Sequence, residues 1–238
     1  NPLAGVSFSM SGGQYGGSII NVGTSDSSGT LVLNLKPGTY NITAGYQFTK
    51  AYEKEVILGA EGLTVEFATH EARVRVINSF GEPLANVSLS YGASSSYPTF
   101  GKTDVDGVAV RELFAGTYGI QAVYKGTRSG YIPVDIRAGG IDHVFQTTRV
   151  QFNYNGRIDY LGSDNSYYKL SDSMQSGEMF PGTYKFFFGG SVKPQFTQVI
   201  TIGQDPIHVN TALVTLKNST GQGLAGGVVS YYAGGWVE

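Results

Sequence analysis

The sequence predicts an all-β protein made of tandem β-sandwich units. The first observation is a segment that recurs three times and ends each time in Gly-Thr-Tyr. Its copies are Leu35-Lys36-Pro37-Gly38-Thr39-Tyr40, Leu113-Phe114-Ala115-Gly116-Thr117-Tyr118 and Met179-Phe180-Pro181-Gly182-Thr183-Tyr184. The second is the pattern after each copy, where apolar residues stand at every second position, as in a strand with one buried face. The third is the absence of a helical period, while turn residues separate short apolar segments throughout.

Composition excludes several classes of function. Charged residues make up 14% of the 238 residues, against roughly 25% in ordinary soluble domains. A net charge of −2 offers no basic surface for nucleic acid. The chain contains no Cys, so it has neither disulfides nor a Cys-based metal site. No run of apolar residues is long enough to predict a membrane span.

The first predicted unit covers residues 1–70. Alternating apolar residues predict strands at residues 6–10, 31–35 and 40–46, with closing strands at 56–58 and 63–67. Asp26 and Gly29 predict a turn in which the carboxylate accepts backbone N–H groups and the glycine takes a positive φ. Pro37 followed by Gly38 is typical of a type II turn.

The second predicted unit, residues 71–148, repeats these features. They are a strand at 72–76, a Pro-Leu-Ala turn at 83–85 and an Asp-Gly turn at 104–107. The apolar alternation slips between Val110 and Leu113, which predicts a β-bulge there.

Two further units follow, residues 149–211 and residues 212–238. Gly38 and Gly116 are 78 residues apart, whereas Gly116 and Gly182 are 66 apart, so the third unit is shorter. In it, Asn155-Gly156 predicts a hairpin, and residues 198–202 predict a closing strand. The fourth unit contains only its opening strands, predicted at residues 213–216 and 229–232.

We expect the first and last units to be cut in mid-repeat. The first has no counterpart of the strand at 72–76, which residues 213–216 supply to the fourth. A sandwich without one strand exposes an apolar groove and an unpaired edge. Either the chain continues as a longer array, or the ends of different molecules complete one another by β-augmentation. The second strand of the fourth unit duplicates residues 6–10, and this favours the longer array.

These features resemble a known group of repeats. Three segments are similar to prealbumin-like sandwich repeats, a group that includes Cna B-type and carboxypeptidase-regulatory-like modules. They are Asn78-Ser79-Phe80-Gly81-Glu82-Pro83-Leu84, Thr103-Asp104-Val105-Asp106-Gly107 and Pro181-Gly182-Thr183-Tyr184. The segments Val214-Thr215-Leu216-Lys217 and Tyr231-Tyr232-Ala233-Gly234-Gly235-Trp236 resemble repeats of very large secreted bacterial proteins. The resemblance implies Ig-like or prealbumin-like sandwiches in an elongated array on a prokaryotic cell surface. Cna B-type modules often carry a Lys–Asn isopeptide bond assisted by an acidic residue.

Tyr40, Tyr118 and Tyr184 are interpreted as structural tyrosine corners. In such a corner the ring packs in the core and the hydroxyl bonds to backbone across the turn. Antibody domains carry a disulfide cysteine two residues after this tyrosine. The residues at that place here are Ile42, Ile120 and Phe186, so packing replaces the disulfide.

The sequence predicts no catalytic, cofactor or metal site. Residues 104–107 contain a fragment of a calcium loop, but the distant Glu ligand is missing, so we interpret it as a turn and keep calcium as the alternative. His70, His143 and His208 are isolated in the sequence, with the last two at matching places before the last strand of their units. No Ser-His-Asp order, zinc-protease motif or phosphate loop is present.

Two kinds of surface feature remain. Asn41, Asn86 and Asn218 begin glycosylation sequons, about two of which this composition produces by chance. Six aromatic residues offer a sugar-stacking platform as an alternative to core packing: Tyr97, Tyr167, Tyr168, Tyr231, Tyr232 and Trp236.

The sequence therefore favours a non-enzymatic structural segment of an extracellular surface protein, such as a stalk, filament or surface layer. Its expected partners are neighbouring repeats of the same or like chains. The alternatives are a carbohydrate-binding or adhesive module, with glycans as partners, and an accessory region of a secreted polysaccharide-active enzyme.

Overall fold

The computed structural model describes most of the chain. Its described residues run from 2 to 237 except for 48, 93–96, 138–139, 155, 171–175, 193–195, 204–206, 211–219, 221, 223–230 and 233–235. The fold is all-β, as predicted. In the described part, the helical structure is one 3-10 turn, η1 (Gly13–Tyr15), and no helix has the length and apolarity needed to cross a membrane.

The first group of strands forms one antiparallel sheet. Its strands are β1 (Ser7–Gly12), β2 (Ile20–Thr24), β3 (Gly38–Tyr46) and β4 (Thr49–Leu58), in the order β2-β1-β3-β4. The central strand β3 begins at the first Gly-Thr-Tyr copy. Val6 and Ala44 form a small core with partly buried Leu3, Phe8 and Phe67.

The second group forms two sheets around a larger core. One has the order β12-β5-β8, from β5 (Thr69–Ile77), β8 (Val108–Phe114) and β12 (Ile141–Gln146). The other has the order β10-β9-β6-β7, with β11 also paired to β9, from β6 (Ser88–Gly92), β7 (Thr99–Lys102), β9 (Gly116–Tyr124), β10 (Thr127–Arg128) and β11 (Ile132–Ile136). Strand β5 is central, antiparallel to β8 and parallel to β12.

The third group repeats this arrangement. Its sheet β16-β13-β19 comprises β13 (Thr148–Asn153), β16 (Ser176–Met179) and β19 (Ile207–Asn210), with β13 central. Its sheet β15-β14-β17-β18 comprises β14 (Ile158–Leu161), β15 (Tyr167–Lys169), β17 (Gly182–Phe188) and β18 (Phe196–Ile202). Strands β20 (Tyr231–Tyr232) and β21 (Trp236–Val237) pair with each other.

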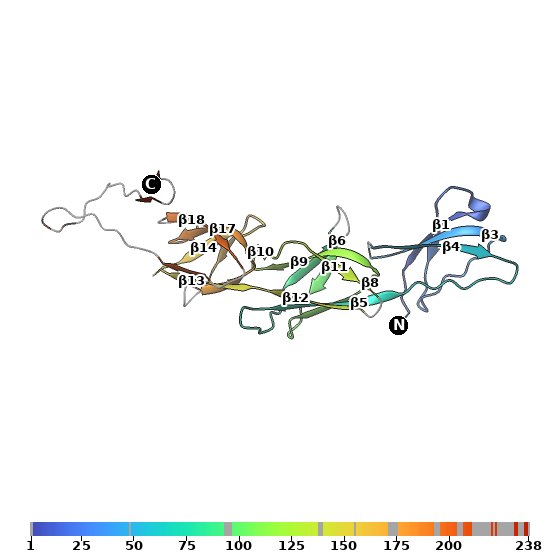
Figure 1. Cartoon of the computed structure of the whole chain (residues 1–238), viewed down its shortest axis with the longest axis horizontal. Coiled ribbons are helices and arrows are strands. Elements are labelled where there is room, and N and C mark those ends of the chain that lie inside the picture. The colour runs from blue at the N-terminus through green and yellow to red at the C-terminus, as the bar shows by residue number, and fades with distance from the viewer. Residues whose placement is uncertain are drawn as a thin grey trace.

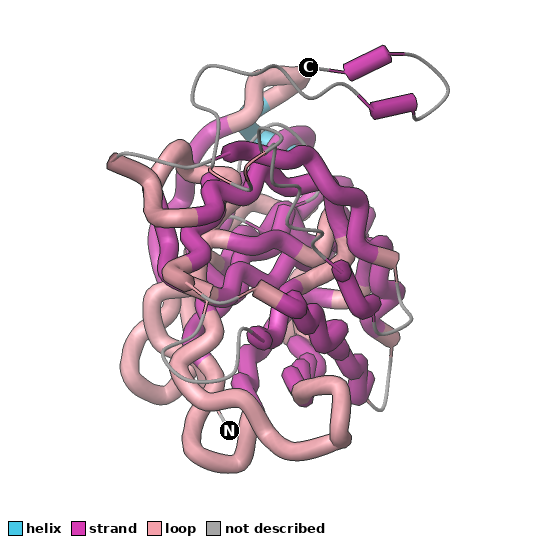
Figure 2. Tube along the Cα trace, turned by 90° about the vertical axis from the view of Figure 1, so that its left-hand side faces the viewer, coloured by secondary structure: helices cyan, strands magenta, loops and turns pink. Residues whose placement is uncertain are grey.

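The three groups follow one another along the longest axis of the molecule (Figure 1). Figure 2 looks down that axis and shows their strands overlapping in projection. Strand β12 ends at Gln146 and β13 begins at Thr148, so a single residue joins the second and third groups there. The division into units at 1–70, 71–148, 149–211 and 212–238 stays a prediction.

Two predicted strands are wrong. Residues 31–35 and 63–67 lie outside all strands. Their counterparts 78 residues later belong to β8 and β12, and both of those pair with the central strand β5. The described residues of the first group contain no counterpart of β5, so these two segments have no ladder partner.

Three local predictions are also wrong. Gly38 does not have the positive φ of a type II turn; it is the first residue of β3, and a Cβ there would lie 3.6 Å from the Tyr40 ring. Pairing of β8 with β5 is continuous, so there is no bulge between Val110 and Leu113. Asn155-Gly156 does not close a hairpin, because β13 and β14 belong to different sheets; Asn155 itself lies outside the described residues.

Candidate functional site: the junctions between groups of strands

The three repeated tyrosines have the same geometry. Tyr40, Tyr118 and Tyr184 are 1%, 4% and 6% exposed. Each hydroxyl donates a hydrogen bond to the carbonyl four residues earlier, at 2.8, 3.0 and 2.9 Å respectively. Burial raises the pKa of Tyr184, which keeps its hydroxyl a donor. The repeated glycine lies under the ring: a Cβ on Gly182 would lie 3.0 Å from the Tyr184 Oη.

In the second and third groups, the residue whose carbonyl accepts the tyrosine hydroxyl is a phenylalanine, and its side chain packs in the preceding group of strands. Tyr118 binds the carbonyl of Phe114, whose side chain is 2% exposed and packs in the core of the first group with Val6 and Ala44. Tyr184 binds the carbonyl of Phe180, which is 1% exposed and packs in the core of the second group. Each later group therefore contributes one aromatic side chain to the core of the group before it.

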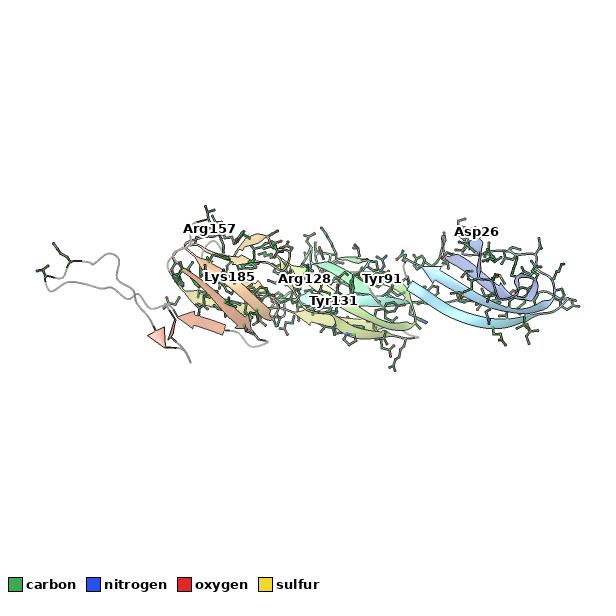
Figure 3. The ribbon with its side chains drawn as sticks, turned by 90° about the horizontal axis from the view of Figure 1, so that it is seen from above. Asp26, Tyr91, Arg128, Tyr131, Arg157 and Lys185 are labelled. Atoms are coloured by element: carbon green, nitrogen blue, oxygen red, sulfur yellow. The ribbon has the colours of Figure 1, made fainter. Side chains whose placement is uncertain are left out.

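A second tyrosine in each later group also contacts the group before it. The Tyr91 hydroxyl on β6 donates to the carbonyl of Gln47, and the Tyr160 hydroxyl on β14 donates to the carbonyl of Lys125 at 2.5 Å. Both acceptors have positive φ, 47° and 44°, and they are 78 residues apart. Burial raises the pKa of Tyr160 well above its usual value. Figure 3 shows Tyr91 at the end of the second group that faces the first.

The junction between the second and third groups has further polar contacts. The carboxylate of Glu178 on β16 accepts hydrogen bonds from the Ser79 N–H at 3.0 Å, the Ser79 hydroxyl at 2.6 Å and the Thr147 hydroxyl at 2.6 Å. The Phe180 N–H donates to the hydroxyl of the fully buried Thr127 at 3.1 Å. These bonds hold residues 178–180 against the second group.

A cavity of about 510 Å³ lies between the first and second groups. Its lining includes Lys54, Phe67, His70, Phe114, Asp135 and Arg137. The Lys54 ammonium donates to the Glu66 carbonyl and lies 5.1 Å from the Phe67 ring centre, while Asp135 pairs with Arg137. The charged groups that line the cavity are thus engaged with protein partners, and the lining shows no nucleophile–base–acid arrangement.

The structure places the remaining predicted residues apart from one another. Asn41 lies on β3, Asn86 is exposed in a turn with φ 60°, and Asn218 lies outside the described residues. The Asp104 Oδ1 accepts the N–H groups of Asp106 and Val108, as in the predicted turn. Among the described residues, no group of three or more His, Cys, Asp and Glu side chains is placed to hold a metal ion.

The histidines and aromatic residues are also separated. His70 lies on β5, His143 on β12 and His208 on β19, so the last two are inside the strands they were expected to precede. Tyr97 stacks on Tyr131, whereas Tyr167 contacts Phe187 and Tyr168 stacks on Tyr160. The side chains of Tyr231, Tyr232 and Trp236 lie outside the described part of the chain.

No protein-family model matches the chain, and no curated protein matches it. Among solved structures, it is similar to the TIE protein of Bacillus anthracis, with 9% identity over 94% of this chain and 59% of that one, at a TM-score of 0.30. It is also similar to the shaft pilin SpaA of Lactobacillus rhamnosus GG, with 11% identity over 62% of this chain and 100% of that one, at a TM-score of 0.26. A streptococcal ancillary pilin has 12% identity, coverage of 83% and 82%, and a TM-score of 0.29.

The chain thus spans 59% of the length of the TIE protein. TM-scores this low do not establish a shared fold, so none of these likenesses assigns a function to the chain. Membership of the prealbumin-like or Cna B-type group stays a prediction.

Proposed function

We propose that the chain is a non-enzymatic structural segment of an extracellular surface protein. In this proposal the units 1–70, 71–148, 149–211 and 212–238 are β-sandwiches joined end to end, and they act as a stalk or filament that holds other parts away from the cell. Their partners are neighbouring repeats of the same chain or like chains. Surface-layer material is a variant of the same role.

One observation carries this proposal: the two contacts that repeat at successive junctions. A buried phenylalanine, Phe114 or Phe180, packs in the core of the preceding group. A tyrosine hydroxyl, from Tyr91 or Tyr160, binds a backbone carbonyl of that group. Two separated attachment points oppose bending and twisting where a single linker would allow both. A stalk that holds other parts of a protein away from the cell needs such stiff junctions.

Solution scattering tests the proposal. Three sandwiches of about 27 Å each, with linkers, give a rod of about 100 Å and a radius of gyration of about 29 Å. One compact globule of this size has a radius of gyration of about 18 Å. A value near the lower figure contradicts the proposed rod. The double variant Phe114→Ala, Phe180→Ala should give a broader distance distribution if the aromatic contacts set the stiffness, and Val105→Ala, at a side chain that is 81% exposed, should not.

The surface location needs a separate test, which is labelling of intact cells of the source organism with an antibody against the chain. Labelling only after the cells are broken open contradicts an extracellular role.

A second candidate function is glycan binding at one exposed aromatic pair. Tyr97 and Tyr131 stack at 4.3 Å between ring centres and are 51% and 41% exposed, and Figure 3 shows Tyr131 on the second group. An exposed aromatic face is a common surface for sugar stacking. Binding on a glycan array that disappears in Tyr131→Ala, and persists in Tyr167→Ala, supports this candidate; no binding by the wild-type chain rejects it.

A further inference from the structure

The chain enters and leaves the second group of strands through two neighbouring strands that run in the same direction. Strand β5 opens the group and β12 closes it, and the two are paired in parallel. Their pairing begins with Ala72 opposite Ile141 and ends with Ile77 opposite Gln146. We call this pair of hydrogen-bonded strands the β5–β12 ladder.

The third group has the same arrangement. Strand β13 opens it, and β19, the last strand described in that group, lies parallel to β13. Their pairing, the β13–β19 ladder, begins with Val150 opposite Ile207 and ends with Asn153 opposite Asn210. Only Thr147 separates β12 from β13, so the two ladders follow each other directly along the chain. Figure 1 shows β5, β12 and β13 lying along the longest axis of the molecule.

The parallel pairing decides how a pull along the chain reaches the hydrogen bonds of the ladder. The chain enters β5 at Thr69 and leaves β12 at Gln146, and these two points lie at opposite ends of the ladder. Tension along the chain therefore slides β5 and β12 past each other, and the evenly spaced bonds between them carry the load together. Two strands pulled apart from the same end would instead lose their bonds one after another. Because forced unfolding depends on the barrier to unfolding, sliding should need the higher force.

Strand β12 is the one that has to slip. It is an edge strand paired with β5 alone, whereas β5 is also paired with β8 from Thr69 opposite Phe114 to Arg75 opposite Val108. The inner side of the ladder is shielded from water, because the inward side chains of β5 are fully buried: Ala72, Val74 and Val76. Hydrogen bonds shielded in this way are stronger than bonds in contact with water.

Two further bonds hold the end of the ladder at which the chain leaves the second group. The Thr147 N–H donates to the Ile77 carbonyl at 3.1 Å, which continues the pairing beyond the last residue of β12. The Gln146 side chain donates to the Asn78 carbonyl at 3.3 Å. Both bonds join the two sides of the ladder where a pull from the third group arrives, so both oppose the slip of β12.

We propose that the β5–β12 and β13–β19 ladders are mechanical clamps, which keep the second and third groups folded when the chain is pulled along its length. The biological use of the clamps rests on the proposed function, because a stalk that holds other parts away from the cell is loaded along its axis. The mechanical property itself rests on the strand pairing alone.

The two clamps are unequal. The β5–β12 ladder has six residue pairs and the additional bond from Thr147 to Ile77, whereas the described β13–β19 ladder has four pairs. Fewer bonds loaded together give way at a lower force. The third group should therefore open before the second when both are pulled in series.

Single-molecule force spectroscopy on the full 238-residue chain tests the clamp, and the absence of native cysteines allows handles at two chosen positions. Glu71→Cys with Gln146→Cys applies the pull from opposite ends of the β5–β12 ladder. The matched control, Glu71→Cys with Asp142→Cys, applies it from one end of the same ladder. All three residues are exposed, and thermal unfolding without load checks that both variants are folded. The first variant should withstand at least about three times the force of the control at the same pulling speed.

The order of opening tests the ranking of the two clamps. With handles at Glu71→Cys and Glu238→Cys, the pull crosses both ladders and leaves the first group unloaded. Opening of the third group, between Thr148 and Asn210, should release about 63 residues or about 220 Å of extended chain. Opening of the second group, between Glu71 and Gln146, should release about 76 residues or about 265 Å. The shorter release should come first and at the lower force.

Two results would overturn the proposal. Equal forces in the two handle geometries at the β5–β12 ladder would show that sliding of the strands does not set the resistance. A longer release that regularly comes first would show that the number of paired residues does not rank the clamps. Failure of the stalk function is a separate outcome: a compact radius of gyration or labelling only of broken cells would reject the stalk, whatever force the ladders withstand.

Discussion

Replacing Phe180 by Ala should damage the group of strands that precedes the residue, more than the group to which it belongs. Phe180 belongs to the third group and directly follows β16, but its side chain is 1% exposed in the core of the second. Its ring meets that of Phe145 edge to face, with 6.4 Å between ring centres. Loss of a buried phenylalanine side chain costs about 3–5 kcal/mol. A group of this size has a total stability of about 4–12 kcal/mol, so the loss is a large fraction.

Hydrogen exchange followed by mass spectrometry provides the assay, because it reports each group separately. In Phe180→Ala, exchange should accelerate in β5 and β12 of the second group, and little in β14 and β17 of the third. The control is Val105→Ala, since Val105 is 81% exposed and its loss should leave exchange unchanged. Acceleration confined to β14 and β17 would refute the reasoning, because it would show that Phe180 stabilises only its own group.

Three further predictions concern individual polar side chains. Tyr118→Phe removes the hydroxyl that binds the Phe114 carbonyl and should cost about 1–3 kcal/mol in denaturant unfolding, whereas an unchanged midpoint would contradict a role for that bond. Glu178→Gln removes the charge that Ser79 and Thr147 stabilise and should cost about 1–3 kcal/mol; a stabilised variant would contradict this. Burial raises the pKa of Asp159, but hydrogen bonds from Arg157 and Ser191 outweigh it and lower the pKa overall. Its stabilisation is therefore complete above the unfolded pKa of about 3.9 and is lost as the pH falls through the lower folded pKa. Asp159→Asn should flatten that acid dependence, and an unaltered acid limb would contradict the assignment.

The sequence predicted best what is determined within a few residues. The turn at Asp26 is an example: its carboxylate accepts the Ser28 and Thr30 N–H groups, and Gly29 has φ 72°. Side chains that bond to nearby backbone specify such turns whatever surrounds them. The strand from residues 40 to 46 was predicted for a similar reason, since its alternating pattern requires only one buried face.

Predictions that depended on distant partners succeeded less well. Residues 31–35 have a clear strand pattern, yet a strand also needs a hydrogen-bonded neighbour, and residue periodicity does not supply one. The junction contacts of Tyr91 and Tyr160 were missed because they join residues 44 and 35 positions apart. One local signal for the junction was present. The slip in alternation after Val110 marks the place where Leu113 faces its own core and Phe114 faces the core before it.

The phenylalanine contacts between groups make an earlier core depend on a later group of strands, and not the reverse. Phe114 and Phe180 each complete a core that lies before them in the sequence, so each core depends on the group that follows it. The equivalent residue of the first copy is Lys36, which is exposed and whose carbonyl still accepts the Tyr40 hydroxyl. The hydrogen bond from the tyrosine hydroxyl is thus present whether or not the residue four positions earlier is aromatic. The bond therefore stabilises the turn within its own group, whereas the phenylalanine stabilises the contact between two groups. A substitution at a tyrosine corner should therefore weaken its own group first, and should reach the preceding group only where a phenylalanine stands four residues before the tyrosine.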